Sequence, residues 1–409
     1  MMKILHIFPY SPIPPTFGGA LRVYNLIKQM SKYNQVTLLT FGDENIKQVL
    51  KNNFSNTVNE IHTCYIPKYR RKKRLVQLYS LLRNQSSFSL IAYHKQMQHI
   101  IDKLTSDNKY DIVQFEFPHM ANYRINSDAI KILDAHNVEH LIYYHQWQYT
   151  NSKLRKFFYK REYKKLFHDE ISACKNQDAL LVTSQNDAST FDKFIPEIPK
   201  YLIPNGVDTE YFHPTEENHE QYSLVFTGAL SYIPNSDGAI YFIEQILPHI
   251  QKIYPDIKIY IVGKNPPNNL LEKSSKNVII TGYVEDVRPY VWKSAIFVVP
   301  LRMGSGTRLK ILEALAMKKP VVTTSVGAEG LDVINGETVL IADDPKDFAE
   351  KVINLIKDNQ LQQKLVSNGY ELAKNVYDWI VIGEKLNEVY KTIYSFHKNS
   401  RVKKTNHKK

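Results

Sequence analysis

The sequence predicts an α/β protein made of two doubly wound domains, each a parallel sheet with helices on both faces. Three observations lead to this fold class. Short apolar runs alternate with helical stretches along the chain, and 409 residues exceed one ordinary core. Three of the 15 glycines precede residue 205 and twelve follow it, which indicates two domains of different construction.

The first domain is expected over residues 1–204. It opens with an apolar run, a loop rich in proline and glycine, and a helix with apolar residues at helical spacing. The expected strands are Ile4–Phe8, Val36–Phe41, Asp111–Phe115, Ile130–Ala135 and Ala179–Thr183.

The second domain is expected over residues 205–377, after a linker at 200–221 that carries turn signals. Its expected strands are Ser223–Phe226, Ile257–Val262, Val278–Thr281, Ile296–Pro300, Val321–Thr324 and Val339–Ile341. Helices are expected at Pro345–Asp358, Gln360–Lys374 and Trp379–Phe396. The segment 378–396 is expected to cross back to the first domain, and 397–409 to form a basic tail.

Positive charge is concentrated in the first domain and the tail. The chain has 53 Lys/Arg and 41 Asp/Glu, a formal charge of +12. Residues 1–204 carry 28 basic and 17 acidic residues, 205–397 carry 19 and 24, and 398–409 carry six and none. This uneven distribution of charge bears on the binding partners of the protein, because it sets the electrostatic field that an approaching polyanion or anionic membrane meets.

The cysteines and the N-terminal residues indicate in which cellular compartment the protein is expected. Cys64 and Cys174 lie far apart, which supports neither a disulfide framework nor a zinc site and favours a reducing compartment. The opening apolar run is too short for a signal peptide, and no 18-residue apolar stretch occurs. A soluble or peripherally attached cytoplasmic protein is therefore expected.

The densest motif runs from Val299 to Ala314. A strand ends, a glycine turn follows, and a helix begins whose dipole and free N–H groups favour a diphosphate. Arg308 and Lys310 lie in its first turn, where cations are unfavourable to the helix itself, so an anionic ligand is expected there; solvated charges are the alternative. Glu313 is placed to accept hydrogen bonds from ribose hydroxyls, or is a surface residue.

The first domain offers a second group of candidates. Gly18 and Gly19 allow a close backbone approach to a ligand, and Arg22 follows one turn into the helix, either on the acceptor side or solvated. His136 follows the strand Ile130–Ala135, where it is placed to touch a substrate hydroxyl or to serve a structural role.

Further glycine loops follow strands of the second domain and are expected to turn backbone N–H groups to a sugar or phosphate. They contain Gly228, Gly263, Gly282, Gly327, Ala328, Glu329 and Gly330. The chain lacks G-x-G-x-x-G after its first strand, and a P-loop, which makes NAD and P-loop chemistry unlikely.

At these residues the sequence resembles the retaining nucleotide-sugar glycosyltransferases of family 4, which have the GT-B fold, and in particular the bacterial surface-polysaccharide branch. The resemblance covers nearly the whole chain. It is carried by Gly18-Gly19-Ala20, Asp134 to Glu139, Ile203 to Asp208, Phe226 to Leu230 with Pro234-Asn235, and Pro300 to Gly330.

The resemblance implies two Rossmann-like domains facing each other across a cleft, the first for the acceptor and the second for a UDP-, GDP-, ADP- or TDP-sugar. It implies catalytic roles for His136, Arg308 and Lys310. No motif of the Asp-x-Asp type is placed at a strand end, so no metal or other cofactor is expected. The residues implied at the donor are Gly19, Gly228, Asn235, Gly263, Tyr283, Val284, Ser305, Gly306, Thr307, Glu313, Gly327, Ala328, Glu329 and Gly330, with Tyr283 and Val284 at the base.

Three positions depart from the family pattern. Ser305 stands where the first of two glutamates is usual, which puts the donor sugar in doubt. The basic residues usual near Gly228 are absent, so Arg308 and Lys310 are expected to take over the diphosphate. Lys318 replaces a helix-ending glycine, at a cost of about 1 kcal/mol if its backbone is left-handed.

Three basic segments, 68–74, 153–165 and 398–409, are expected to bind an anionic membrane surface. Aromatic residues interleave the second, which reads as a basic amphipathic helix or as a helix that packs its aromatics into the domain. Nucleic-acid binding is not expected, because no recognised motif accompanies the charge.

The sequence thus favours an enzyme that moves a sugar from a nucleoside diphosphate to a glycan or lipid-linked acceptor in cell-surface polysaccharide synthesis, on the inner face of the membrane. The alternative is a non-catalytic GT-B subunit that binds a glycan or lipid carrier, which the serine at 305 permits.

Overall fold

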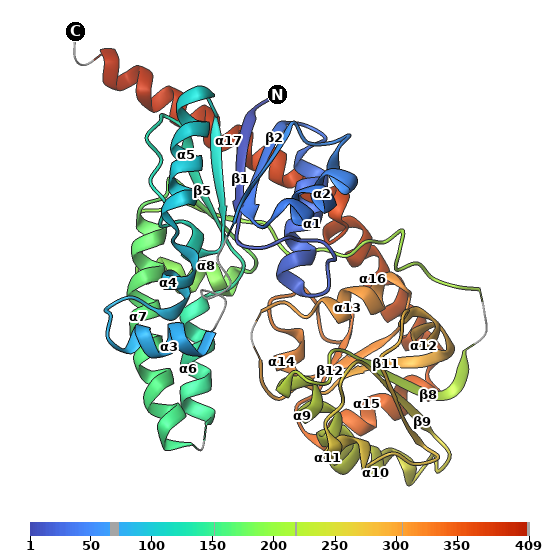
Figure 1. Cartoon of the computed structure of the whole chain (residues 1–409). Helices are drawn as coiled ribbons and strands as arrows, with labels where there is room; N and C mark the ends of the chain where they lie inside the picture. Colours follow the sequence, from blue (N-terminus) through green and yellow to red (C-terminus); the bar gives the residue numbers. More distant parts are fainter. Residues whose placement is uncertain (66–72, 151, 217–218, 305, 407–409) are drawn as a thin grey trace. The chain divides into compact units, whose positions relative to one another are not determined.

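The computed structural model of the chain divides into two compact units, Met1–Pro204 with Gly383–Lys409, and Asn205–Ile382 (Figure 1). The structure describes residues 1–65, 73–150, 152–216, 219–304 and 306–406. The first boundary falls where the sequence changes its glycine content and its charge. The second lies within the last helix, five residues after the segment expected to cross back begins.

The first unit holds a seven-stranded parallel sheet in the order β3-β2-β1-β4-β5-β6-β7. Its strands are β1 Lys3–Phe8, β2 Gln35–Phe41, β3 Glu60–Cys64, β4 Ile112–Glu116, β5 Ile130–Ala135, β6 Ala179–Val182 and β7 Lys200–Leu202. Its helices are α1 Gly18–Met30, α2 Glu44–Phe54, α3 Lys73–Leu81, α4 Ser87–Ala92, α5 Lys95–Asp107, α6 Glu139–Tyr149, α7 Lys153–Lys175 and α8 Gln185–Asp192, with a 3₁₀ turn at Pro118–Met120.

The second unit holds a six-stranded parallel sheet in the order β10-β9-β8-β11-β12-β13. Its strands are β8 Glu220–Thr227, β9 Lys258–Val262, β10 Val278–Gly282, β11 Ser294–Val299, β12 Val321–Thr323 and β13 Leu340–Ile341. Its helices are α9 Ile233–Tyr241, a π-helical turn Phe242–Ile246, α10 Leu247–Gln251, α11 Asn268–Leu271, α12 Arg288–Lys293, α13 Leu309–Ala316, α14 Ser325–Ala328, α15 Pro345–Lys357 and α16 Asn359–Val376.

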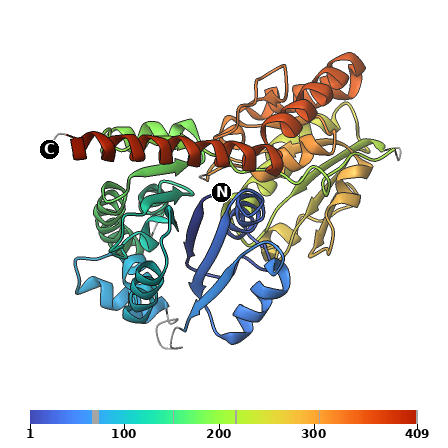
Figure 2. The ribbon, with the colours of Figure 1, turned by 90° about the horizontal axis from the view of Figure 1, so that it is seen from above.

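The last helix, α17, runs from Trp379 to Asn406 and returns the chain to the first unit. Figure 2 shows it as one long helix beside that unit's strands and helices. Asn387 on α17 accepts a hydrogen bond from Asn34, and Tyr390 donates one to Gln114 in β4.

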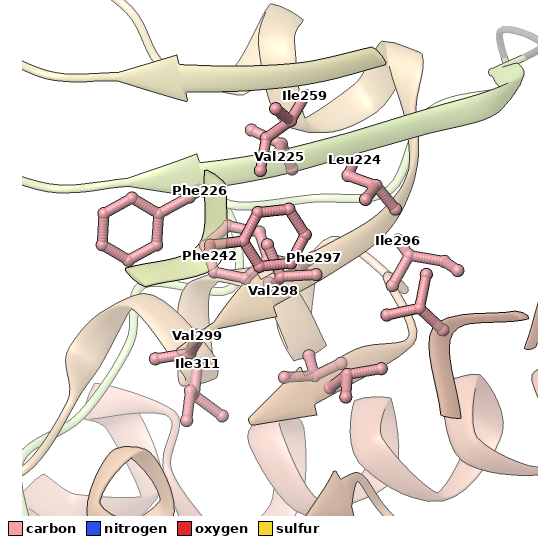
Figure 3. Close-up of a cluster of buried hydrophobic side chains, with 14 of the residues drawn as sticks. Leu224, Val225, Phe226, Phe242, Ile259, Ile296, Phe297, Val298, Val299 and Ile311 are labelled. Carbon is pink, nitrogen blue, oxygen red and sulfur yellow. The ribbon is translucent and has the colours of Figure 1, made fainter. Parts of the chain in front are cut away.

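The alternation of side chains along the strands explains the two cores. In β1, β4 and β5, residues of one face, such as Leu5, Phe115 and Leu133, are fully buried in the apolar core. In the second unit, Phe226 of β8 and Phe297 of β11 are buried on opposite faces of the sheet, since Phe297 is paired with Val225, and Phe242 is buried in the π-helical turn (Figure 3). Both sheets are therefore covered on both faces, as parallel sheets require.

Two strands were not expected from the sequence. β3 reads Glu-Ile-His-Thr-Cys, a half-polar edge strand without a clear apolar run. β7 is a three-residue edge strand at the start of the segment expected to be a linker, and β8 begins at its end.

Lys318 has a left-handed backbone, the conformation for which a cost of about 1 kcal/mol is expected from the sequence. Its φ is 55°, at the point where α13 has ended, and its ammonium lies 4.7 Å from the centroid of the Tyr370 ring. A glycine would relieve about 1 kcal/mol of strain here and would lose this contact.

Candidate active site

The loop after β11 leads into a helix N-terminus without a protein cap. Arg308 at the N-cap position of α13 makes no capping hydrogen bond through its side chain, and the first turn holds no acidic residue. The N–H groups at the start of α13, and the positive end of its dipole, are thus not neutralised by a cap or an acid of the helix. The Thr307 hydroxyl is buried here without a hydrogen-bond partner among the described residues. The arrangement favours an anion.

Lys310 joins this N-terminus to the end of β8. Its Nζ donates a hydrogen bond of 2.8 Å to Asn235 Oδ1 and lies 4.2 Å from the centroid of the Phe226 ring. A Cβ added to Gly228, whose φ is 150°, would lie 2.7 Å from this Nζ and 2.8 Å from Asn235 Nδ2. The structure therefore brings together three of the expected donor residues, Gly228, Asn235 and Lys310, and requires glycine at the first.

The cations of this site are held in desolvating surroundings. Burial lowers the pKa of Lys310 to about 7, with Glu313 opposing and Arg308 adding to the effect. Burial raises the pKa of Glu313 to about 7, against the pull of Lys310. Burial also lowers the pKa of Arg308, which is 9% exposed and donates to the Gly306 carbonyl. An anionic ligand would favour the charged form of both cations.

The glycines after β8 and β9 serve close packing and do not present their amides to a ligand. Gly228 N donates to the Val262 carbonyl at 3.0 Å, and Gly263 N donates to the Gly282 carbonyl at 3.2 Å. A Cβ on Gly263 would lie 1.7 Å from the Gly228 carbonyl oxygen. The N–H groups of Gly228 and Gly263 are therefore already used by neighbouring strand ends.

The loop after β12 adjoins the same helix N-terminus. Gly327 N donates to Thr324 Oγ1 at 3.0 Å, and its missing Cβ would lie 2.2 Å from Thr323 Oγ1, so this glycine too serves packing. Glu329 is close enough to Arg308 to raise the pKa of that guanidinium, against the effect of burial. Gly330 has a φ of 77°, and Ala328 is buried beside it in the chain.

The remaining donor candidates are less defined by the structure. Tyr283 follows β10 and is 74% exposed, whereas Val284 packs partly against the apolar core. Ser305 lies outside the described residues, so the departure from the family pattern at that position is not resolved by the geometry.

In the first unit, His136 lies at the carboxyl end of β5 and is 4% exposed. Its Nε2 lies 2.5 Å from Glu116 Oε2, and its ring packs on the Phe117 ring with centroids 3.9 Å apart. Phe117 has a φ of 68°, a conformation that costs a non-glycine residue about 1–3 kcal/mol and that clusters at functional sites. This backbone conformation accompanies the contact between the Phe117 ring and the candidate histidine His136.

Gly19 lies beside the same aromatic ring. A Cβ there would lie 2.7 Å from the Tyr10 hydroxyl oxygen and 3.0 Å from Phe117 Cζ. Gly18, the first residue of α1, is exposed. The structure thus brings Gly19, Phe117 and His136 together.

Arg22 is buried within the first unit, which corrects the alternative of a solvated arginine. Its side chain is 1% exposed, and its Nε and Nη2 donate to the two Asp134 carboxylate oxygens at 2.9 Å each. Its Nη1 donates to the Pro204 carbonyl at 3.0 Å. Arg22 therefore links Asp134 in β5 to Pro204, which follows β7, inside the first unit.

Sequence reasoning missed a buried polar row on the face of the sheet opposite the apolar core. His6, Gln114, Glu116 and Asp134 alternate with apolar residues in β1, β4 and β5, and all four are fully buried. Polar residues at every second position of an otherwise apolar strand were the available signal.

Glu116, Asp134 and His136 each offer one atom to a common point, within 4.8 Å of one another, as a metal site would require. However, Asp134 is held by the Arg22 guanidinium and Glu116 by two imidazoles. This donor set is already used by protein groups.

Glu139 was also missed as a candidate, although it follows His136 by three residues. Burial and the nearby Glu170 raise its pKa to about 8, while a hydrogen bond to Asn137 lowers it. The Glu170 carboxylate accepts the backbone N–H groups of Glu139 and His140 at 2.8 and 3.1 Å, which fixes the start of α6. The surroundings of Glu139 therefore favour its protonated form.

Two family models match the chain, one on each unit. The model described as Glycosyltransferase Family 4 matches residues 18–211, and the model described as Glycosyl transferases group 1 matches residues 221–358.

Individual relatives agree with the models. A Klebsiella pneumoniae protein described as an uncharacterised 44.6 kDa protein in the cps region is 25% identical over 92% of this chain and 97% of its own length. The capsular polysaccharide biosynthesis glycosyltransferase CapM of Staphylococcus aureus is 28% identical over 46% of this chain and 53% of its own.

Among solved structures, Anabaena HepE in complex with UDP has the same fold, with a TM-score of 0.68 and 14% identity over 96% of this chain and 100% of that one. This likeness shows two Rossmann-like domains of the GT-B type. The family models on both units show that the chain belongs to the family 4 glycosyltransferases, and the structural likeness shows the GT-B fold.

Proposed function

We propose that this protein is a retaining glycosyltransferase that takes a sugar from a nucleoside diphosphate without a metal ion. The observation that carries the proposal is the N-terminus of α13, which lacks a cap and an acid and adjoins two desolvated cations, Arg308 and Lys310. A diphosphate bound there supplies the negative charge that this end of the helix lacks.

The same groups account for the chemistry. The diphosphate gains charge as its bond to the sugar breaks, and preorganised cations and amides stabilise that charge. Attack by the acceptor on the face that the leaving phosphate vacates retains the anomeric configuration, and this route needs no pair of enzyme carboxylates, unlike glycoside hydrolysis. In this proposal Glu313 binds the ribose and His136 contacts the transferred sugar.

Surface-polysaccharide synthesis is the process that the relatives suggest. One relative is described by its place in a cps region, and another as a glycosyltransferase of capsular polysaccharide biosynthesis. We extend this to the present chain as a proposal, with a growing glycan or a lipid-linked sugar as the acceptor.

A panel of UDP-, GDP-, ADP- and TDP-sugars tests the donor. One of them is expected to raise the thermal stability of the protein, by about 2.7 kcal/mol at 100 times its dissociation constant. The same donor is expected to be turned over at an unchanged rate in EDTA. Binding without hydrolysis or transfer would favour the non-catalytic subunit, and complete loss of turnover in EDTA would contradict metal independence.

Donor binding is expected to take up protons at pH 8. With a pKa of about 7, free Lys310 is mostly neutral at pH 8, and a diphosphate favours its charged form. At pH 6 the free lysine already carries its proton, so this uptake disappears.

Titration calorimetry in buffers of different ionisation enthalpy measures the proton number directly. Lys310→Ala is expected to abolish the uptake at pH 8. Proton release at pH 8 in the unaltered protein would contradict a diphosphate at Lys310.

The surface that could bind a membrane is smaller in the structure than the sequence suggests. No helix in the described ranges is both long enough and apolar enough to cross a bilayer. In α7, Phe158, Tyr159 and Tyr163 are half-buried, and Tyr159 and Tyr163 pack against aromatic residues of α6, so the helix is not a simple amphipathic one. The segment 66–72 and residues 407–409 lie outside the described residues.

Three apolar side chains of this region, Leu82, Leu154 and Phe157, are 85%, 84% and 60% exposed. Arg161 lies near two of them: it donates to the Leu81 carbonyl at 3.3 Å, and its guanidinium lies 5.8 Å from the centroid of the Phe157 ring. We take the three apolar side chains together as a patch. We propose that this patch and its cations hold the protein on the anionic inner face of the cell membrane.

Charge reversal on α7 tests the membrane contact. Changing Lys156, Lys160, Arg161 and Lys164 to Glu is expected to lower partitioning onto anionic liposomes by more than about 10-fold, since each basic residue near such a surface contributes about 1 kcal/mol. The matched control reverses four exposed lysines of the second unit, Lys252, Lys276, Lys346 and Lys357. Equal losses in both variants would contradict a localised docking surface.

A further inference from the structure

The candidate catalytic His136 shares a buried carboxylate with a second histidine. Glu116 ends β4, the strand between β1 and β5, and is fully buried. Its Oε2 lies 2.5 Å from His136 Nε2, and its Oε1 lies 2.5 Å from His6 Nε2. One carboxylate thus bridges two imidazoles that come from either side of its own strand.

The carboxyl group of Glu116 is ionised. Burial alone would raise the pKa of Glu116, but the charges and hydrogen bonds of His6 and His136 bring it well below its usual range. Gln114 Nε2 donates a third hydrogen bond to Oε1, at 2.8 Å. Since a carboxylate only accepts, the proton in each histidine contact belongs to the imidazole Nε2.

His6 meets the Glu116 carboxylate through its Nε2. Its Nδ1 is buried and has no hydrogen-bond partner among the described residues. A proton on that nitrogen would bury an unpaired cationic N–H, which costs more than the roughly 1–3 kcal/mol of an unpaired neutral group. His6 therefore donates from Nε2, where the Glu116 carboxylate accepts the proton.

The other charged groups near His136 do not neutralise the negative charge of the Glu116 carboxylate. Arg22 and Asp134 pair with each other, and Asp134 Oδ2 lies 3.9 Å from His136 Nε2. His119 is neutral, because burial, and secondarily His136, lower its pKa to about 4. The negative charge of Glu116 thus acts on His136 through its Nε2 proton.

We propose that Glu116 is a positioning residue that fixes the tautomer of His136, with the proton on Nε2 and a lone pair on Nδ1 for a hydroxyl of the transferred sugar. Nδ1 makes no hydrogen bond to any residue in the described ranges, so its lone pair is not used by those residues. This inference rests on the proposed function, in which His136 contacts that sugar. A ring held by Phe117 and a fixed tautomer accept the hydroxyl without reorganising.

The C-terminal helix holds Glu116 indirectly. The Tyr390 hydroxyl on α17 donates to Gln114 Oε1, and Tyr390 is fully buried. With its oxygen taken, the Gln114 amide can only present its NH₂ group to Glu116. The Oε1 side of Glu116 therefore meets two donors, Gln114 Nε2 and His6 Nε2.

This geometry makes Glu116→Gln a tautomer switch. A glutamine at 116 would turn its oxygen to Gln114 and His6 and its NH₂ group to His136. His136 would then accept at Nε2 and carry its proton on Nδ1, where it could no longer accept from a sugar hydroxyl. The expected loss in kcat/KM for sugar transfer is about 10- to 100-fold, the effect of losing one strong hydrogen bond.

Nitrogen-15 NMR of histidine-labelled, full-length protein reads the tautomer without turnover. At pH 9 the unaltered protein is expected to show a proton on Nε2 of His136 and none on Nδ1, and Glu116→Gln a proton on Nδ1. Glu116→Asp, which keeps a carboxylate, is expected to keep the original tautomer and more of the activity, and it replaces Glu116→Gln if that variant does not fold.

A proton on Nδ1 of His136 in the unaltered protein at pH 9 would overturn the inference, as would an unchanged tautomer in Glu116→Gln. Failure of the unaltered protein to use any sugar nucleotide would instead overturn the proposed function and leave the tautomer result standing. The two claims therefore fail separately.

Discussion

Lys310→Ala is expected to lower kcat/KM for sugar transfer by about 10²- to 10³-fold, the usual effect of removing one group that stabilises a developing oxyanion. Lys310 Nζ lies at the α13 N-terminus, hydrogen-bonded to Asn235 and beside the glycine that leaves room for it. Steady-state kinetics with the donor identified from the nucleotide-sugar panel measures the loss.

Stability separates this effect from misfolding. The lysine is held at a cost, because burial lowers its pKa to about 7, so its removal is expected to leave the melting temperature unchanged or higher. Lys293→Ala is the matched control: its ammonium lies 3.8 Å from the centroid of the Tyr260 ring, in the same unit, and its loss is expected to leave transfer unchanged. A loss below about threefold in Lys310→Ala would contradict the donor assignment.

Arg22→Met is expected to destabilise the protein by about 3–5 kcal/mol, because it leaves the Asp134 carboxylate buried and unpaired. Arg22 and Asp134 are 1% and 0% exposed and share two hydrogen bonds of 2.9 Å. Urea unfolding followed by circular dichroism measures the change.

The double variant Arg22→Met with Asp134→Leu separates the pair from packing. Replacing both partners of a buried ion pair by apolar residues is often neutral, so most of the stability is expected to return. If Arg22 instead served an acceptor, Arg22→Met would stay within about 1 kcal/mol of the unaltered protein and lose acceptor affinity.

Much of the fold could be predicted because the strands of a doubly wound sheet are buried on both faces. Ile130–Ala135 was predicted with its observed bounds, and the other expected strands differ from the observed ones only near their ends. The two strands that were missed, Glu60–Cys64 and Lys200–Leu202, lie at the two edges of the first sheet, where burial on one side no longer imposes an apolar run.

The candidate site could be predicted where its chemistry is local in the chain. Arg308, Lys310 and Glu313 lie within one motif, and the structure places Arg308 and Lys310 at the N-terminus of α13 and Glu313 one turn further along it. Gly228 and Gly263 were expected at the site for their amides, but those amides pair with neighbouring strand ends, a pairing that the sequence of either loop does not reveal.

The polar row of the first unit shows the opposite case. Glu116 meets His6 across 110 positions of sequence and His136 across 20. Arg22 meets Asp134 across 112 positions, so an arginine on the first helix reads as exposed until its partner is placed. The order of the strands in the sheet decides which of these residues meet, and short-range sequence patterns do not reveal that order.

The most direct test of the proposed function is the stereochemistry of sugar transfer, followed by proton NMR with the donor found in the panel and EDTA present. The account predicts one nucleotide sugar that is turned over and a first product with the anomeric configuration of the donor. An inverted first product, or no turnover of any nucleotide sugar by a folded protein that binds one, would contradict it.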